Sequence, residues 1–379
     1  MKTTERKKNH LMILGTRGIP ARHGGFETFA ENLARFLVGH NWEVTVYCQA
    51  PRSARLGRSE WEGVQLVHIP AGGSGPLSTI MFDLRATLHA AAQKGLILTL
   101  GYNTAIFLVW LKLRGIRNLI NMDGIEWLRS KWPLPARIWL YFNERLAGRF
   151  ASHLIADNPA IKTHLLRHVG NEHITMIPYG SSSITDADES FLAQFNLQPN
   201  QYFLVVARSE PENSVLEIVQ AFCMRRRGIK LVILGKYYPD VVRYHRQVIE
   251  ACNEEVLLAG AIYDTTILSA LRFHARLYVH GHQVGGTNPS LVEALGAGNA
   301  VLAHDNKFNR WVMGQAGLFF SDVNSCAEQF DILLEDVAQL ETLRAASRER
   351  HREQFQLETV LKEYESLLAR WHPNASAYS

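Results

Sequence analysis

The sequence predicts an α/β protein built from two doubly wound, mainly parallel sheets in tandem. Short apolar runs typical of buried strands alternate with segments of helical periodicity along almost the whole chain. Glycine-rich turns follow several of these strands, and one polar segment at 179–188 interrupts the alternation before it restarts. The 379 residues are enough for two domains of ordinary size.

The first half opens with a βαβ unit. A strand at 11–14 leads into a loop rich in glycine, a helix at 26–38 and a strand at 44–47. The pattern then continues, with strands expected at 64–69, 96–100, 118–122, 153–156 and 174–178 and helices at 79–93, 104–113, 133–150 and 160–168.

The second half repeats the pattern after the polar segment. Strands are expected at 202–207, 230–234, 256–259, 277–279 and 300–303, and helices at 214–226, 241–252, 265–274 and 289–297, followed by a helical tail at 325–370. In open α/β sheets, ligands bind beyond the carboxyl ends of the strands, so the loops at those ends are the candidate sites.

Composition favours a cytoplasmic protein with a substantial core. Hydrophobic residues make up 47% and charged residues 20%, and the net charge of +4 suits an anionic substrate or a membrane surface. The four cysteines lie far apart without metal-ligand spacing, which is typical of reduced thiols. We expect no secretory signal in the polar first ten residues, and the apolar stretch 96–113 fits a strand and a helix better than a membrane span.

The stretch 280–298 holds the main candidate site of the second half. A strand runs into the Gly285-Gly286 turn, and Asn288 then caps a helix. The N–H groups of Gly286 and Thr287 at such a helix start favour phosphate, and Glu293, one turn further on, could accept hydroxyls of a ribose. The plainer alternative is an ordinary strand-to-helix connection with a capped helix.

Two cations follow other strands of this half. Arg208 ends the strand 202–207, and Lys236 comes after Gly235, so either could lie beside phosphate oxygens. His280 and His282 precede the key loop, but a third metal ligand is missing from the pattern, so we interpret them as polar lining.

In the first half, Gly24 and Gly25 would let the backbone approach a ligand closely at the mouth of the first helix. The spacing of the glycines does not match G-x-G-x-x-G, which disfavours dinucleotide binding. A flexible surface loop is the alternative interpretation.

Asp123 and Glu126 follow the strand 118–122, where carboxylates could bind sugar hydroxyls or take a proton, although Asp123 could simply cap the next segment. Basic and aromatic residues then interleave on a helical segment. This pattern fits either an anionic membrane or lipid diphosphate, or a solvated helix with a buried aromatic stripe. The residues are Arg129, Lys131, Trp132, Arg137, Trp139, Tyr141, Arg145 and Arg149.

Four segments together resemble a known family. The stretches 24–28 (GGFET), 123–127 (DGIEW), 208–213 (RSEPEN) and 285–293 are similar, in this order, to the family-four retaining glycosyltransferases of GT-B fold. Within that family the chain is most similar to a rhamnosyltransferase-like branch of bacterial polysaccharide synthesis. The resemblance implies an acceptor-side domain at 1–182, a donor domain at 183–354 facing it across a cleft, and a C-terminal helix at 355–379 that crosses back to the first domain.

The resemblance also implies roles for individual residues. Glu293 matches the glutamate that holds the donor ribose, and Arg208 matches the arginine that binds the donor diphosphate. Gly285 stands where the family usually has its first glutamate, Asn213 where it has a lysine, and Asp123 where many relatives have a histidine. The catalytic assignment is therefore Asp123, Arg208 and Glu293; the donor-binding assignment is Gly24, Gly25, Asn213, Lys236, Gly285, Gly286, Thr287 and Asn288; and the acceptor-binding assignment is Glu27, Glu126, Trp127 and Arg129.

The implied reaction is retaining transfer of L-rhamnose from dTDP-rhamnose to a lipid-linked or oligosaccharide acceptor, as in O-antigen or capsule synthesis. A front-face route without metal or other cofactor is implied, and the sequence offers no obvious nucleophile. We expect a cytoplasmic protein with a peripheral contact to the inner membrane and no nucleic-acid partner. The alternatives are a UDP- or GDP-sugar donor, or a catalytically weak nucleotide-sugar binding protein. An NAD-linked oxidoreductase, an epimerase and a phosphorylase find no support in the motifs.

Overall fold

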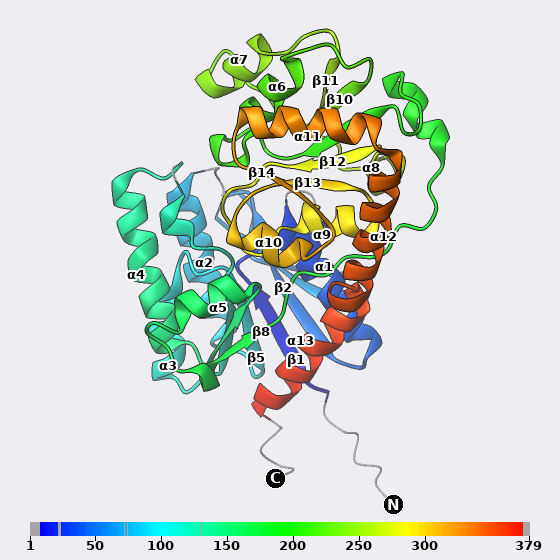
Figure 1. Cartoon of the computed structure of the whole chain (residues 1–379). Helices are drawn as coiled ribbons and strands as arrows, with labels where there is room; N and C mark the ends of the chain where they lie inside the picture. Colours follow the sequence, from blue (N-terminus) through cyan, green and yellow to red (C-terminus); the bar gives the residue numbers. More distant parts are fainter. Residues whose placement is uncertain (1–7, 22–23, 72, 74, 130, 374–379) are drawn as a thin grey trace, which may run out of the picture. The chain divides into compact units, whose positions relative to one another are not determined.

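The computed structural model describes residues 8–21, 24–71, 73, 75–129 and 131–373 and divides the chain into two compact units (Figure 1). Unit 1 comprises Met1–Trp127, Leu134–Ile177 and Val360–Ser379, and unit 2 comprises Leu128–Pro133 and Pro178–Thr359. Each unit has its own sheet. No helix in the described ranges combines the length and the apolar character needed to cross a bilayer.

Unit 1 is organised around an 8-stranded sheet of its described residues, in the order β3-β4-β2-β1-β5-β6-β7-β8. Only the edge pair β3–β4 is antiparallel within this described sheet. The strands are β1 (His10–Leu14), β2 (Glu43–Ala50), β3 (Gly57–Trp61), β4 (Val64–Pro70), β5 (Leu96–Leu100), β6 (Asn118–Asn121), β7 (His153–Ala156) and β8 (Ile174–Met176). The helices are α1 (Gly25–Gly39), α2 (Pro76–Ala90), α3 (Leu108–Leu113), α4 (Leu134–Phe150), α5 (Pro159–Leu165) and α13 (Leu357–Trp371), with short 3₁₀ turns η1 (Ala105–Phe107), η2 (Glu126–Leu128) and η3 (Asn171–His173).

The C-terminal helix α13 belongs to unit 1 from Val360 onward, as the sequence predicts for a helix that crosses back. Asn121 at the end of β6 donates its Nδ2–H to the Tyr364 hydroxyl at 2.8 Å, and the rings of Phe29 and Tyr364 lie 4.7 Å apart. The Trp42 indole N–H also donates to Glu365 at 3.2 Å. These contacts bind the end of the chain to the first-half sheet.

Unit 2 has a 6-stranded, fully parallel sheet within the described residues, in the order β11-β10-β9-β12-β13-β14. The strands are β9 (Tyr202–Val206), β10 (Lys230–Leu234), β11 (Val256–Gly260), β12 (Leu277–His280), β13 (Val301–His304) and β14 (Gly317–Phe320). The helices are α6 (Val215–Cys223), α7 (Arg243–Glu250), α8 (Thr265–Phe273), α9 (Pro289–Gly296), α10 (Lys307–Met313), α11 (Val323–Glu335) and α12 (Val337–Gln354), with the 3₁₀ segments η4 (Glu189–Phe195) and η5 (Pro211–Asn213).

The core of unit 2 follows from strand alternation. Phe203 and Val205 of β9 pack into a cluster with Phe222 of α6 and Phe330 of α11. The intervening Leu204 joins a second cluster that includes residues of α8 and α9. Because successive strand residues point to opposite faces, these clusters lie on the two faces of the sheet and hold its central strands rigidly.

The structure adds several elements that the sequence analysis did not predict, among them β3, β14, α10 and η4. Strand β3 is polar and largely exposed, so it carries no apolar alternation, and it forms because it pairs with β4. Strand β14, helix α10 and the 3₁₀ segment η4 are each 7 residues or fewer. Elements this short give a weak periodic signal.

Candidate functional site

The candidate site of unit 2 lies along the carboxyl-end edge of its parallel sheet. Strands β10, β9, β12 and β13 are neighbours in the sheet order, so the residues that follow them line the same edge. These residues include Arg208, Lys236, His282 and Asp305. The sequence identified the first three as polar or cationic, and the sheet order brings them to one edge.

Arg208 and Lys236 supply positive charge to this edge. Both side chains are exposed, and within the described ranges neither forms an ion pair with a carboxylate. The Lys236 ammonium lies 5.3 Å from the centre of the Tyr263 ring, which orients it without neutralising it. Two cations are therefore available to an anionic ligand.

Asn213 supports the backbone of the Arg208 loop. Its Nδ2–H donates to the Arg208 carbonyl at 2.9 Å, and the side chain is buried. Gln283 clamps the same loop, because its backbone N–H donates to the Glu212 carbonyl and its Nε2–H to the Ser214 hydroxyl, each at 2.9 Å. The structure thus shows a positioning role for Asn213, and it adds Gln283 as a residue that the sequence analysis missed.

His245 of α7 fixes the loops that follow β9 and β10. Its Nδ1 accepts from the Tyr238 backbone N–H at 2.8 Å, and its Nε2 lies 2.8 Å from the Ser209 carbonyl. An acceptor at Nδ1 leaves the proton on Nε2, so one imidazole bridges both loops. Its spacing in the sequence gave no sign of this role.

The start of α9 is built as the sequence predicts. Asn288 caps the helix, with its Oδ1 accepting from the Ser290 N–H and from the Ser290 hydroxyl, each at 3.0 Å. The Tyr278 hydroxyl of β12 donates to Ser290 at 2.9 Å, which ties the cap to the sheet. Gly285 has a φ of 127°, a conformation that favours glycine, and the space beside it is open. Gly286 and Thr287 between them are buried.

Glu293 has a specific partner. Its Oε2 lies 2.5 Å from Arg272 Nη2 of α8, and its side chain is 27% exposed whereas that of Arg272 is 6% exposed. Burial, and secondarily the negative charge of Glu293, raise the pKa of the nearby Tyr179 phenol. The carboxylate is therefore held by an arginine from a different helix, and one oxygen remains for another contact.

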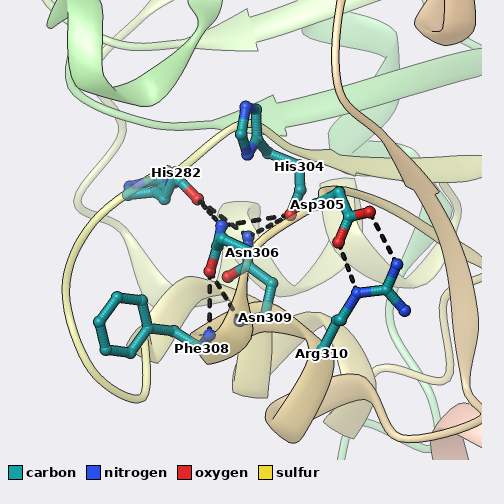
Figure 2. Close-up of polar contacts among 7 residues, drawn as sticks. All are labelled: His282, His304, Asp305, Asn306, Phe308, Asn309 and Arg310. Carbon is teal, nitrogen blue, oxygen red and sulfur yellow. Dashed lines mark hydrogen bonds and ion pairs between the residues drawn. The ribbon is translucent and has the colours of Figure 1, made fainter. Parts of the chain in front are cut away.

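Asn306 and Asn309 connect the ends of β12 and β13, as Figure 2 shows. Their Nδ2 groups donate to the carbonyl oxygens of His282, at 3.0 and 2.9 Å, and of His304, at 3.2 and 2.8 Å. Asn306 also caps α10. Beside them, Asp305 and Arg310 form a bidentate ion pair with N–O distances of 2.5 and 2.7 Å. This network holds the backbone of the His280–His282 segment in place.

The histidines of this edge remain neutral at physiological pH. The rings of His280 and His282 stack with centres 4.3 Å apart and planes 10° apart. Burial, followed by the neighbouring His282 and His304, lowers the pKa of His280 well below its usual value. Burial, Arg208 and Arg129 together lower the pKa of His282 to about 3. Among the described residues no group of three or more His, Cys, Asp or Glu is arranged to hold a metal ion.

The first-half candidates Gly24, Gly25 and Glu27 lie at the start of α1. Glu27 is buried, and its Oε1 accepts from the Arg17 backbone N–H at 3.1 Å. A Cβ at Gly24 would lie 3.4 Å from Glu27 Oε2, an ordinary van der Waals contact. Glu27 therefore orders the glycine loop that follows β1.

The D-G-I-E-W segment follows β6, at the same carboxyl-end edge of the unit 1 sheet. Asp123 has a φ of 50°, and its N–H donates to Asn121 Oδ1 at 2.9 Å. The Glu126 N–H donates to the Tyr102 hydroxyl at 2.7 Å. The Trp127 indole N–H donates to the buried Glu144 at 2.9 Å. Backbone and side-chain hydrogen bonds thus tie this segment to Asn121, Tyr102 and Glu144.

Arg129 lies in the Leu128–Pro133 stretch, which groups with unit 2. Its Nη1–H donates to Glu212 Oε1 at 2.8 Å, and both side chains are largely buried. The residue thus groups with the Arg208 loop, whereas the other residues that the sequence assigns to an acceptor belong to unit 1.

Comparisons with known proteins address the family and the fold. A family profile described as a domain of unknown function (DUF1972) matches residues 8–182. No curated protein gives a significant match. Among solved structures, a sucrose-phosphate synthase from Thermosynechococcus elongatus is similar, with a TM-score of 0.81, 19% identity and coverage of 96% of this chain and 99% of that one.

Two further solved structures are also similar to this chain. HepE from Anabaena, in complex with UDP and glucose, has a TM-score of 0.74 at 15% identity and covers 96% of this chain and 100% of its own. A glycosyltransferase from Rickettsia africae has a TM-score of 0.69 at 12% identity, with 96% and 99% covered. Two Rossmann-like α/β units with this likeness over nearly the whole chain give the protein the GT-B fold, which confirms the predicted fold class.

Proposed function

We propose that the protein is a glycosyltransferase that moves a sugar from a nucleoside diphosphate sugar to an acceptor hydroxyl. The observation that carries the proposal is the edge of the unit 2 sheet, where Arg208 and Lys236 are exposed without a carboxylate partner within the described ranges, beside the capped start of α9. A diphosphate needs this combination of cations and helix-start N–H groups. The structural likeness to HepE bound to UDP and glucose supports the same ligand class.

In this proposal, unit 2 binds the donor and stabilises the departing diphosphate. Each well-placed donor aimed at a developing negative charge lowers the activation barrier by about 3–4 kcal/mol. Arg208 and Lys236, with the N–H groups of Gly286 and Thr287, are the assigned donors. The two side-chain cations would neutralise the leaving group, so we propose that no metal ion is required.

Unit 1 would bind the acceptor. Glu126 and Trp127 follow β6 in a segment held by hydrogen bonds, and Glu27 is buried at the start of α1. Carboxylates carried on backbone held in this way suit sugar hydroxyls. We propose a lipid-linked or oligosaccharide acceptor on the grounds of the family resemblance of the GGFET and DGIEW motifs.

The same resemblance supports L-rhamnose from dTDP-rhamnose as the donor and retention at the anomeric carbon. Retention by front-face attack would let the leaving phosphate take the acceptor proton, so no protein nucleophile is assigned. UDP-glucose is the second donor to test, because HepE has been crystallised with UDP-glucose.

The test is donor binding and transfer with purified protein. Thermal shift with dTDP-rhamnose, UDP-glucose and a GDP-sugar identifies the donor, and transfer of the labelled sugar to a lipid-linked acceptor measures activity. Loss of a charge-assisted hydrogen bond in Arg208→Ala or Lys236→Ala should weaken donor binding by about tenfold to a hundredfold. Arg226→Ala, which removes an exposed arginine elsewhere in unit 2, is the matched control. Absence of both binding and transfer with every donor contradicts the proposal.

A catalytically weak nucleotide-sugar binding protein is the second candidate. The observation that favours it is Asn213, whose amide is occupied by the Arg208 carbonyl where the resembling family supplies a lysine. Donor binding that depends on Arg208, combined with no transfer to any acceptor, would select this function. Asn213→Lys would then be the informative variant for a gain of turnover.

A further inference from the structure

Helix α4 of unit 1 buries two polar side chains and exposes several large apolar ones. Its buried residues are Leu140, Asn143, Glu144 and Ala147. Asn143 accepts from the Ile106 N–H at 2.9 Å, and Glu144 contacts Trp127 Nε1 and His164 Nε2, each at 2.9 Å. Polar groups are thus satisfied on the inner face, whereas a surface helix normally buries an apolar stripe.

The outer face of α4 carries the apolar stripe instead. Leu134, Ile138 and Phe142 are spaced four residues apart, so they lie on one side of the helix, and all three are exposed. The sequence left open whether the aromatic residues of this helix are buried. Trp139 is 38% exposed, Tyr141 37% and Phe142 59%, so the buried aromatic stripe is the wrong alternative.

The neighbouring η1–α3 segment extends this surface. Helix α3 packs beside α4 (Figure 1). Ile106, Trp110 and Leu113 recur at helical spacing and are exposed, Leu113 by 78%. Trp139 of α4 donates its indole N–H to the Asn103 carbonyl at 2.8 Å, which joins the two segments. We call the exposed apolar side chains of η1, α3 and α4 the α3–α4 face: Ile106, Trp110, Leu113, Leu134, Ile138, Trp139, Tyr141 and Phe142.

The exposed charges of α3 and α4 are all positive. Lys112 and Arg114 lie at the end of α3, and Arg145 and Arg149 continue the outer stripe of α4. The one acidic residue of α3 and α4 is Glu144, which is 1% exposed. The cations of the α3–α4 face are therefore not offset by an exposed carboxylate of the same helices.

Two of the arginines lie over aromatic rings of the face. The guanidinium of Arg114 is 4.6 Å from the centre of the Trp110 ring, and that of Arg145 is 5.0 Å from the centre of the Tyr141 ring. Aromatic rings and positively charged guanidinium groups therefore lie side by side on the same surface. Amphipathic helices that lie in a lipid interface combine these two chemistries.

We infer that the α3–α4 face docks on an anionic lipid bilayer, with its apolar side chains in the acyl boundary and its arginines among the headgroups. Charge complementarity selects this occupant, because an apolar face fringed by uncompensated cations matches a surface that is apolar beneath and negative above. The inference does not depend on the proposed reaction, since it concerns unit 1 alone and needs no nucleotide sugar.

The test is vesicle flotation with the full-length chain. Vesicles of phosphatidylcholine with phosphatidylglycerol should carry the protein to the top of the gradient, vesicles of phosphatidylcholine alone should carry much less, and high salt should reduce binding. Arg145→Glu with Arg149→Glu should weaken binding to anionic vesicles by about tenfold or more. Ile138→Ser with Phe142→Ser should weaken it by about tenfold or more as well.

Matched controls lie in unit 2. Val241→Ser removes a side chain that is 86% exposed, and Arg226→Glu reverses an exposed charge, so neither should alter binding. Thermal melts establish that each variant is folded. Equal binding to neutral and anionic vesicles, binding that survives both double variants, or no binding at all overturns the inference. A dimer that Ile138→Ser with Phe142→Ser disperses, without vesicle binding, would assign the face to self-association instead.

Discussion

Gly281, which directly follows β12, should not tolerate a side chain. A Cβ there would lie 2.2 Å from the Asn213 carbonyl oxygen and 2.8 Å from Ile218 Cδ1. The oxygen is backbone, so no rotamer change relieves the overlap, and it would have to move by about 1 Å to reach an ordinary non-bonded separation. Overpacking of this kind costs about 1–3 kcal/mol. Gly281→Ala should therefore lower the Tm by roughly 2–4 °C for each kcal/mol lost.

The same displacement should reach the proposed donor-binding residues. Asn213 holds the Arg208 carbonyl at 2.9 Å, so moving its backbone moves the loop that carries the Arg208 guanidinium. We expect Gly281→Ala to weaken binding of the preferred nucleotide sugar, measured by isothermal titration below the Tm of the variant. Gly39→Ala is the control, because Gly39 ends helix α1 and a Cβ at this position would have nothing within 4 Å. Unchanged stability and donor affinity in Gly281→Ala would refute the reasoning.

Three further changes test the contacts described above. Tyr364→Phe leaves the Nδ2–H of buried Asn121 without its acceptor and should cost about 1–3 kcal/mol in urea unfolding, and no change would contradict that contact. Burial depresses the pKa of His280, so the folded protein keeps this imidazole neutral at a pH where the unfolded chain takes up a proton. The buried neutral His280 therefore contributes fully to stability above about pH 6.5, and this contribution is lost as the pH falls. His280→Leu should flatten the decline of the free energy of unfolding below that pH, and an unaltered slope would count against it. Glu293→Ala should cost about 1–3 kcal/mol by leaving the Arg272 guanidinium unpaired, and adding Arg272→Leu should recover part of that loss, as a double-mutant cycle would measure.

Elements with a clear apolar pattern were predictable from the sequence. Buried strands such as β1, β9 and β10 appear as short apolar runs, and α1 shows its core positions at helical spacing. Strand β3 could not be found in this way, because its Gly57–Trp61 sequence is polar and its formation depends on pairing with β4. Helix α10 is 7 residues long, which is too short for a clear periodic signal.

The positions of the candidate residues at strand ends were predictable, whereas their supporting contacts were not. Arg208, Lys236 and Asn288 follow or cap elements that the sequence identifies, so parallel topology brings them to one edge. Asn306 and Asn309 acquire meaning only when β12 and β13 are known to be neighbours, because their amides bridge the two strand ends. Strand order is a property of the folded sheet and leaves no mark in local periodicity.

Glu293 shows how a contact seen in the structure adds to a role assigned from the sequence. Family resemblance gives the carboxylate a ribose-binding role, and the structure places its Oε2 at 2.5 Å from Arg272. The two are compatible, because a carboxylate has two oxygens and Glu293 retains 27% of its side-chain exposure. An arginine that fixes one oxygen also removes rotamer freedom from the other, so a hydroxyl that binds there does not have to order the side chain. Arg272, which sequence spacing could not connect to the site, would then act on donor affinity through the orientation of Glu293.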